Sequence, residues 1–103
     1  MRGLPGNLQA MMRQAQQMQE KLAQEIAQIR VEASAGGGMV TVQMDGQKNL
    51  LKVKIDPEVA GDLEMLQDML VAASNEAVKK VDAEVGQKTR GLLGGMGLPP
   101  GLL

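Results

Sequence analysis

Basic side chains at helical spacing are the residues of this sequence best suited to binding chemistry. Lys79 and Arg90 are eleven residues apart, close to a whole number of helical turns, so both would lie on one helix face. Ammonium and guanidinium groups on one face can bind phosphate oxygens. Lys80, Glu84 and Lys88 form an i, i+4 series that supports any solvated helix. Spacing alone favours a solvated helix surface over a phosphate-contacting one.

Three other motifs contain residue types found in ligand sites, but the neighbouring sequence does not match that of such sites. The glycines at 36–38 precede no helix and no Lys-Ser or Lys-Thr pair, so a turn is favoured over a phosphate cradle. The run Gly86-Gln87-Lys88-Thr89 has Gln between Gly and Lys, and no strand precedes it. Acidic residues between 56 and 68 could hold Mg²⁺, but carboxylates in a first helical turn are ordinary partners of the helix dipole. We expect no metal site and no cofactor.

The missing residue types exclude most catalytic chemistry. The 103-residue chain has no His, no Cys and no aromatic residue. Zinc–thiolate sites, disulfides and His-dependent catalytic triads therefore cannot form. Base stacking on aromatic rings, which many single-strand readers use, is excluded as well. We expect a protein that is not an enzyme and has no catalytic residues.

Charge is balanced overall but separated along the chain. The sequence has 11 basic and 12 acidic residues and a formal net charge of −1, so it lacks the basic excess typical of nucleic-acid binders. Basic residues dominate the first long segment, 48–54 and 79–90. The acidic block consists of Asp56, Glu58, Asp62, Glu64 and Asp68. Such separation can produce local patches of either sign.

Two long amphipathic helices are predicted. In residues 7–29 apolar side chains recur at spacings of three and four, and Asn7 is a suitable N-cap. A second stripe of Leu, Ala and Val runs from Leu63 to about Arg90. At about 1.5 Å per residue these helices would measure about 34 Å and about 42 Å. The first stripe, which is narrow enough to indicate packing against another helix, contains Leu8, Met11, Ala15, Met18, Leu22 and Ile29.

Three short strands are predicted between the helices. Apolar and polar residues alternate at 30–35, 39–45 and 48–55, and the glycines at 36–38 suit a hairpin loop with positive φ. Asp45-Gly46 is a turn signal. In the last strand, one face carries Leu51, Val53 and Ile55, and the other carries Leu50, Lys52 and Lys54.

The element order defines the fold class. Asp56-Pro57 ends the last strand and starts a helical turn, and Gly61-Asp62 restarts the chain as the second long helix. The order is therefore α-β-β-β-α. This is an α+β fold with two long helices and a small three-stranded antiparallel sheet.

The predicted domain spans 7–90, with a flexible N-terminus at 1–6 and a flexible tail rich in Gly, Pro and Leu at 91–103. The sequence shows no signal-peptide run and no apolar stretch of membrane-spanning length, so we expect a cytoplasmic protein. The helices are longer than the strands, which places their free ends around Arg13 and Arg90 together as an overhang. An overhang buries little surface and a small domain is marginally stable, which indicates a partner chain.

Five runs of sequence, spread over nearly the whole chain, form a specific combination. They are MMRQAQQMQEKLAQEIAQI (11–29), SAGGGMVTVQMDGQ (34–47), IDPE (55–58), EMLQDMLVAASNEAVKK (64–80) and GLPPG (97–101). Together they resemble the YbaB/EbfC family of bacterial nucleoid-associated proteins. The resemblance implies an α-β-β-β-α homodimer shaped like tweezers, with helical arms projecting from a sheet-built body.

The resemblance also implies binding of duplex DNA with little sequence preference and association with the bacterial nucleoid. Family members carry basic residues at positions that correspond to Arg13, Lys21, Lys79 and Lys80. The family often has Lys or Arg where this chain has Thr41, so the arms rather than the strands are expected to contact DNA. With two further basic residues of the second helix, the candidate DNA-binding residues are Arg13, Lys21, Lys79, Lys80, Lys88 and Arg90.

An alternative function is a protein-interaction adaptor for recombination or replication factors with no direct DNA binding. The Met- and Gln-rich helices and the Leu-rich tail are the features that favour it. The main hypothesis is an architectural or regulatory DNA-binding protein whose partners are double-stranded DNA, a second copy of itself and, in addition, recombination or replication proteins.

Overall fold

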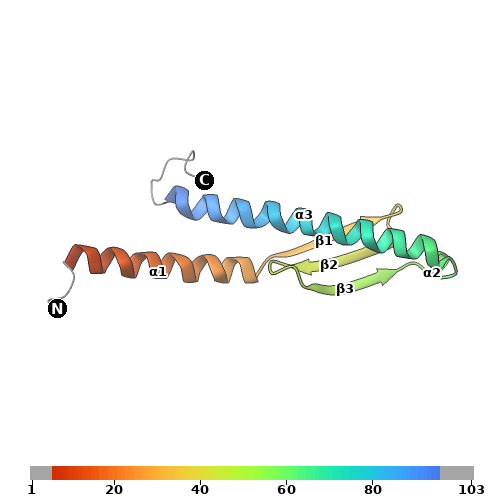
Figure 1. The fold of residues 1–103 in the computed structure, drawn as a ribbon, viewed down its shortest axis with the longest axis horizontal. Coiled ribbons are helices and arrows are strands. Elements are labelled where there is room, and N and C mark those ends of the chain that lie inside the picture. Colours follow the sequence, from red (N-terminus) through yellow and green to blue (C-terminus); the bar gives the residue numbers. More distant parts are fainter. Residues whose placement is uncertain (1–5, 96–103) are drawn as a thin grey trace.

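The computed structural model describes residues 6–95, which form two long helices and a three-stranded sheet (Figure 1). Helix α1 (Gly6–Ala27) leads into strands β1 (Arg30–Ala35), β2 (Val40–Asp45) and β3 (Leu50–Ile55). The short helix α2 (Pro57–Ala60) then precedes helix α3 (Leu63–Gly95). The predicted α+β class and element order are confirmed.

The sheet is a simple antiparallel meander in the order β1-β2-β3. Its β1–β2 loop contains Gly36, Gly37 and Gly38, which have φ angles of 64°, 67° and 93°. A side chain at these positions would be strained, so the three glycines allow the chain to reverse here, as predicted. The register places Ala33 of β1 and Val53 of β3 on either side of Val42.

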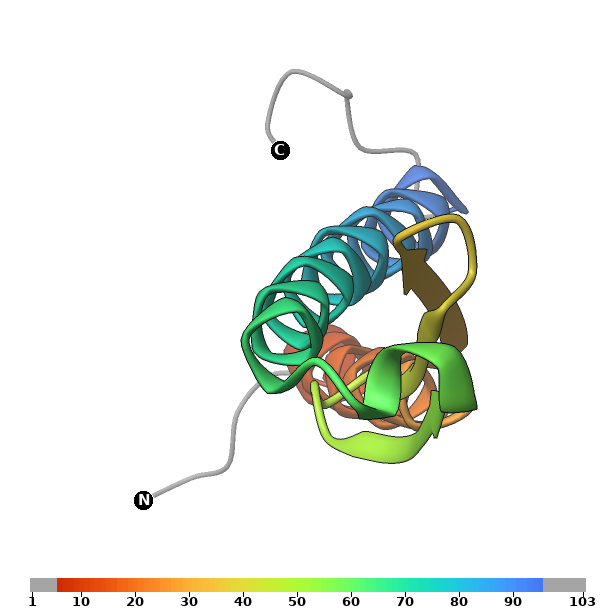
Figure 2. The same cartoon turned by 90° about the vertical axis from the view of Figure 1, so that its right-hand side faces the viewer.

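Helix α3 covers one face of β1 and β2 and closes a small core (Figure 2). Three small residues four positions apart, Ala73, Ala77 and Val81, are fully buried and allow the helix to approach the sheet closely. The opposing residues of β2, Val40, Val42 and Met44, are also buried. The remaining buried hydrophobic residues are Ile29, Val31, Ala33 and Val59, and no polar or charged residue is buried among the described residues. Helices α1 and α2 lie at the two ends of the sheet (Figure 1).

Strand β3 contributes no buried residue to this core. Its pairing with β2 is irregular at Gln43/Met44, so Leu50 rather than Leu51 lies opposite the buried Met44. Since directly paired residues share a face, the prediction that Leu50 lies with the two lysines was wrong, and the irregular pairing is the reason. The exposed apolar side chains of this strand, which we call the β3 strip, are Leu50, Leu51, Val53 and Ile55, at 49%, 46%, 42% and 38% exposure.

Helix α1 also has no buried residue. Met18, Leu22 and Ile26 are half-buried, and the predicted contact with another helix is with α3. The helix ends at Ala27, not at 29 as predicted, where Ile29 N–H donates to Ile26 O at 3.1 Å. Ile29 is therefore not part of the apolar stripe of α1. Its side chain is buried in the core beside the sheet, where it is removed from water more completely than any residue of α1.

Helix α3 is longer than predicted. It continues past Arg90 to Gly95, so the segment 91–95 is helical rather than part of a flexible tail. Half-burial of Leu92 beside α1 favours the helical conformation here, against the cost of about 1 kcal/mol that a glycine adds to a helix interior. The rest of the predicted tail, 96–103, and residues 1–5 of the predicted N-terminus lie outside the described residues.

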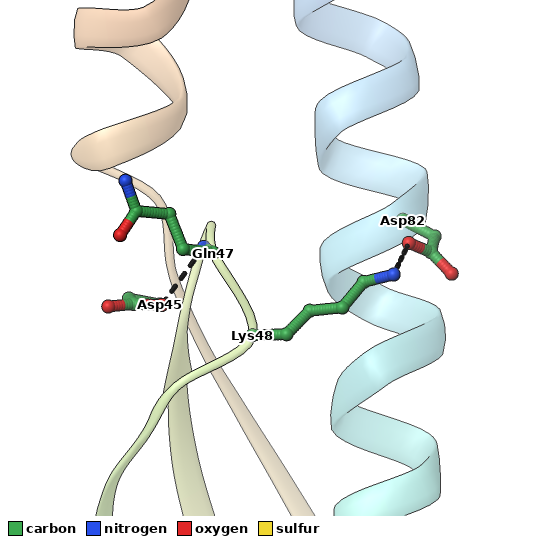
Figure 3. A network of polar contacts seen from close by, with 4 residues as sticks. All are labelled: Asp45, Gln47, Lys48 and Asp82. Atoms are coloured by element: carbon green, nitrogen blue, oxygen red, sulfur yellow. Dashed lines mark hydrogen bonds and ion pairs between the residues drawn. The ribbon is translucent and has the colours of Figure 1, made fainter.

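The β2–β3 turn joins the sheet to both long helices (Figure 3). Asp45 accepts hydrogen bonds from the backbone N–H groups of Asn49 and Gln47, each at 2.9 Å. The Asn49 N–H is the main reason that the pKa of Asp45 lies below its usual value. Lys48, in the left-handed region at φ 68°, forms an ion pair with Asp82 of α3 at 2.8 Å. Gly46 is buried against the last turn of α1, where a Cβ would overlap with a backbone oxygen.

The molecule is strongly elongated. It measures 70 × 28 × 18 Å and has a radius of gyration of 20.0 Å. A compact chain of this length has a radius of gyration of about 13 Å. The difference arises because the first part of α1 and the last part of α3 extend past the same end of the sheet, as the helix lengths predicted (Figure 1).

Candidate nucleic-acid interface

Two projecting helix segments form the most distinctive surface of the protein. We call residues 6–25 of α1 and 84–95 of α3 the arm, because they lie beyond the end of the sheet (Figure 1). Their chains run in opposite directions alongside each other. A hollow of 460 Å³ between the two helices is lined by Met18, Lys21 and Leu92, among others. The arm is thus held by a few half-buried apolar contacts and is otherwise exposed to solvent.

The arm presents two of the predicted basic residues from α1. Arg13 and Lys21 are both exposed. Lys21 borders the hollow between the helices, whereas Arg13 lies two turns closer to the free end of α1. Neither side chain forms a salt bridge with a carboxylate of the described residues. Both cations are therefore available to an anion from outside.

Lys79 and Arg90 share the solvent-facing side of α3. Eleven residues separate them, about three turns, and both are exposed. The Arg90 guanidinium lies over Gly86 one turn earlier, since a Cβ at Gly86 would be 3.3 Å from its Nη1 atom. The core-facing residues Ala77 and Val81 lie on the opposite side of the helix. The face predicted from spacing alone therefore points to solvent.

Lys80 and Lys88 have different surroundings. The Lys80 ammonium donates a hydrogen bond to the backbone oxygen of Glu32 in β1 at 2.8 Å, so it is attached to the sheet. Lys88 lines a hollow together with Glu25 of α1 and Glu84 of α3, which places two carboxylates near it. The structure thus brings Lys79 and Arg90 together on one face and separates Lys80 and Lys88 from them. Lys79 and Lys80 also lie over the sheet rather than on the arm.

The acidic block lies at the opposite end of the molecule, around α2 and the start of α3 (Figure 1). Asp56 accepts from Glu58 N at 2.9 Å and caps α2. Asp62 accepts from Met65 N at 3.1 Å in the first turn of α3. These carboxylates stabilise helix N-termini, as the sequence indicated. The charge separation along the chain becomes a charge separation along the long axis.

Sequence reasoning left out two exposed lysines of β3. Lys52 and Lys54 lie on the sheet face that α3 does not cover, opposite Gln43 and Thr41 of β2. Their spacing of two in a strand correctly predicted that they share a face, but they were not included among the candidate DNA-binding residues. The neighbouring Lys48, by contrast, is used in the ion pair with Asp82.

Other kinds of site find no support in the part of the chain that the structure describes. Within residues 6–95, no three carboxylates gather closely enough to hold a metal ion. No helix in that range combines the length and the apolar character that crossing a bilayer requires. What remains is a set of exposed cations on a long, elongated scaffold.

Fold and surface together define a small α+β protein with a projecting helical arm and exposed basic side chains. The chain belongs to the YbaB/EbfC DNA-binding family, whose model matches residues 5–96. This family is described by DNA binding and not by an enzymatic reaction. The resemblance noted from the sequence is confirmed.

Similar proteins cover almost the whole chain. A nucleoid-associated protein from Koribacter versatilis, Acid345_1974, is 54% identical over 95 residues, which cover 90% of this chain and 94% of that protein. A nucleoid-associated protein from Xanthomonas campestris pv. campestris is 46% identical over 100 residues, covering 94% of both chains. The crystal structure of the uncharacterized protein HP0035 from Helicobacter pylori matches with a TM-score of 0.74 at 23% identity. It covers 88% of this chain and 99% of that one, and shows that the fold is shared.

Proposed function

We propose that this protein binds duplex DNA through its phosphates, with little sequence preference, and acts as an architectural or regulatory component of the bacterial nucleoid. The observation that carries the proposal is the placement of Arg13, Lys79 and Arg90. They are exposed cations on two long helices, without a salt-bridge partner among the described residues. Membership of a DNA-binding family and relatives that are named nucleoid-associated proteins support it.

The chemistry of these side chains explains why little sequence preference is expected. Lys and Arg bind phosphate oxygens and release counterions, which gives affinity without reading the bases. Duplex sequence is read by side chains that reach base edges in the grooves, and phosphate contacts do not require this. The acidic block at the far end repels phosphate, so it favours orientations in which the duplex lies near the basic end.

We further propose that the DNA-binding unit is a homodimer in which a second copy covers the β3 strip. The two edges of the sheet differ. At β1, Lys80 donates to the Glu32 carbonyl, and α3 packs beside the strand. At β3, four apolar side chains are 38–49% exposed and no strand of the same chain, within the described residues, pairs with the outer edge. Exposed apolar strand edges pair readily with another chain.

Dimer formation would also solve the problem of the small core. Helix α1 and strand β3 have no buried residue, so a large part of the described chain contributes little to burial within one copy. A domain with so little buried surface is marginal alone. A second copy adds apolar burial and doubles every basic group on the DNA-binding surface.

The test is a fluorescence anisotropy titration of labelled duplexes of two unrelated sequences with the full chain at several salt concentrations. We expect similar affinities for both sequences and a steep loss of affinity with salt. The slope of log K against log salt reports the phosphate contacts at about 0.9 per contact. As a matched control, Glu64→Gln and Arg13→Gln each change one charge on a helix surface, and only the second should flatten the slope. Absence of binding at low salt refutes the proposal.

The adaptor function is the second candidate, and exposed apolar side chains on the arm favour it. Leu8, Met11 and Met12 are 38%, 62% and 52% exposed, and adaptable methionine surfaces suit protein partners. If the titration shows no DNA binding, replacing Met11 and Met12 by Gln should abolish capture of a recombination or replication protein. If DNA binding is observed and survives this replacement, the arm tip is not part of the phosphate surface.

A further inference from the structure

The sheet face turned away from α3 is not covered by any helix of the described chain (Figures 1 and 2). Alternation along the strands places only polar side chains on this face near its middle. Lys52 lies opposite Gln43, and Lys54 lies opposite Thr41. Glu32 of β1 completes the row on the other side of Gln43. A polar sheet face without a cover is a surface that can meet a partner.

We propose that this face, through Lys52 and Lys54, is a second phosphate-contacting surface of the protein, separate from the arm. The proposal rests on the proposed function, because it takes duplex DNA as the source of the phosphates. A hollow of 200 Å³ lies on the face, bordered by both lysines, Thr41, Gln43 and Glu32. It is wide enough for a phosphate group together with water.

The donor set of this hollow suits an anion. Two residues of a strand that point to the same face are about 7 Å apart, so the two ammonium groups can flank one phosphate or contact neighbouring ones. The Thr41 hydroxyl, hydrogen-bonded to Ser34 at 2.9 Å, and the Gln43 amide add neutral polar groups between them. Lys, Thr and Gln side chains are among the groups that proteins use to contact the DNA backbone.

The contrast with Lys48 shows that these charges are not used within the described part of the chain. All three lysines belong to one hairpin, yet only Lys48 forms a salt bridge in the described residues, at 2.8 Å from Asp82. Lys52 and Lys54 are exposed and keep their charge available. The competing role for lysines on an edge strand is to prevent sheets from pairing edge to edge. That role predicts no effect on the salt dependence of DNA binding.

Replacing Glu32 tests the same surface by removing a negative charge instead of positive ones, so the expected effect on affinity is opposite. Glu32 borders the same hollow, and its negative charge reduces the attraction for a phosphate there. Its backbone oxygen, which accepts from Lys80, is retained in Glu32→Gln. Removing this one negative charge should therefore strengthen phosphate binding without disturbing the attachment of α3. A surface that DNA never approaches would not respond.

The experiment measures the affinity of the full chain for one labelled duplex at several salt concentrations. The main variants are Lys52→Gln/Lys54→Gln and Glu32→Gln. Lys48→Gln is the control for removal of a lysine in the same hairpin, and Glu58→Gln is the control for removal of a carboxylate far from the face. Arg13→Gln/Arg90→Gln, which removes one exposed cation from each helix of the arm, tests the arm in parallel. Thermal unfolding confirms that each variant is folded, which the exposure of these side chains leads us to expect.

We expect the double lysine variant to bind about threefold more weakly per lysine, with a salt slope reduced by about 0.9 for each phosphate that it no longer binds. Glu32→Gln should bind more tightly than Glu58→Gln, and Lys48→Gln should match the unmodified protein. If the arm variant binds weakly while the double lysine variant keeps its slope, the sheet face is refuted and the proposed function stands. If the unmodified protein binds no duplex, both are refuted.

Discussion

Two adjacent lysines, Lys79 and Lys80, provide the sharpest test of how this protein would bind DNA. Lys79 is exposed on the outer side of α3, with no salt bridge to the described residues. The Lys80 ammonium donates to the Glu32 backbone oxygen at 2.8 Å. Replacing each by Gln removes the same charge from neighbouring positions. The structure nevertheless predicts different consequences for binding and stability.

The expected change in salt dependence for Lys79→Gln follows from the number of Lys79 side chains in the DNA-binding unit. Each phosphate contact contributes about 0.9 to the slope of log K against log salt, so a dimer with two copies of Lys79 should have a slope smaller by about 1.8. Over a fourfold increase in salt, a difference of about 1.8 in slope corresponds to a difference of about 12-fold in the loss of affinity. Lys80→Gln should keep the slope and cost about 0.5 kcal/mol of stability, because an exposed hydrogen bond contributes little.

Fluorescence anisotropy at about 50 and about 200 mM salt measures the slopes, a range in which phosphate contacts have large effects. Chemical denaturation of the same samples measures the stability. Equal slopes for Lys79→Gln and Lys80→Gln would contradict the distinction drawn from the hydrogen bond to Glu32. An unchanged slope in Lys79→Gln would remove the outer face of α3 from the proposed interface.

Three further predictions concern assembly, packing and pH. Val53→Asp, in the β3 strip, should convert a dimer to a monomer in light scattering. Met65→Asp is the control and should not, since Met65 is exposed to a similar extent (45%, against 42% for Val53) but lies outside the strip. A monomeric unmodified protein contradicts the dimer proposal. Gly46→Ala should destabilise the protein by about 1–3 kcal/mol in chemical denaturation, because its Cβ would overlap with the end of α1. Gly61→Ala, whose Cβ meets no atom within 4 Å at φ −82°, should be nearly neutral, and equal effects would refute the packing argument. The Asp45 carboxylate should stabilise the fold above its unfolded pKa of about 4, and this stabilisation should disappear as the pH falls through its lower folded pKa. Asp45→Asn should weaken the acid-side pH dependence of unfolding, and an unchanged profile would show that the turn hydrogen bonds have no such effect.

The sequence by itself determined the elements and several of their ends. Alternation at 30–35 needs only the two-residue repeat of a strand, and the stripe through Ala73, Ala77 and Val81 needs only the helical repeat. The glycines at 36–38 and the cap at Asp56 act within a few residues of chain. These signals are local, so the α+β class, the meander and the overhanging helices could be predicted without tertiary contacts.

Only the tertiary structure decided which exposed groups are free and which are used. Lys79 and Lys80 are equivalent in sequence, but β1 lies beside one and solvent beside the other. Because β2 and β3 pair irregularly, Leu50 lies on the apolar face of the sheet. Ile29 is buried in the core and does not belong to the apolar stripe of α1. Each outcome depends on how neighbouring elements pair and pack. Periodicity indicates the apolar face of an element, but not a bulge in its pairing or which neighbour a given side chain meets.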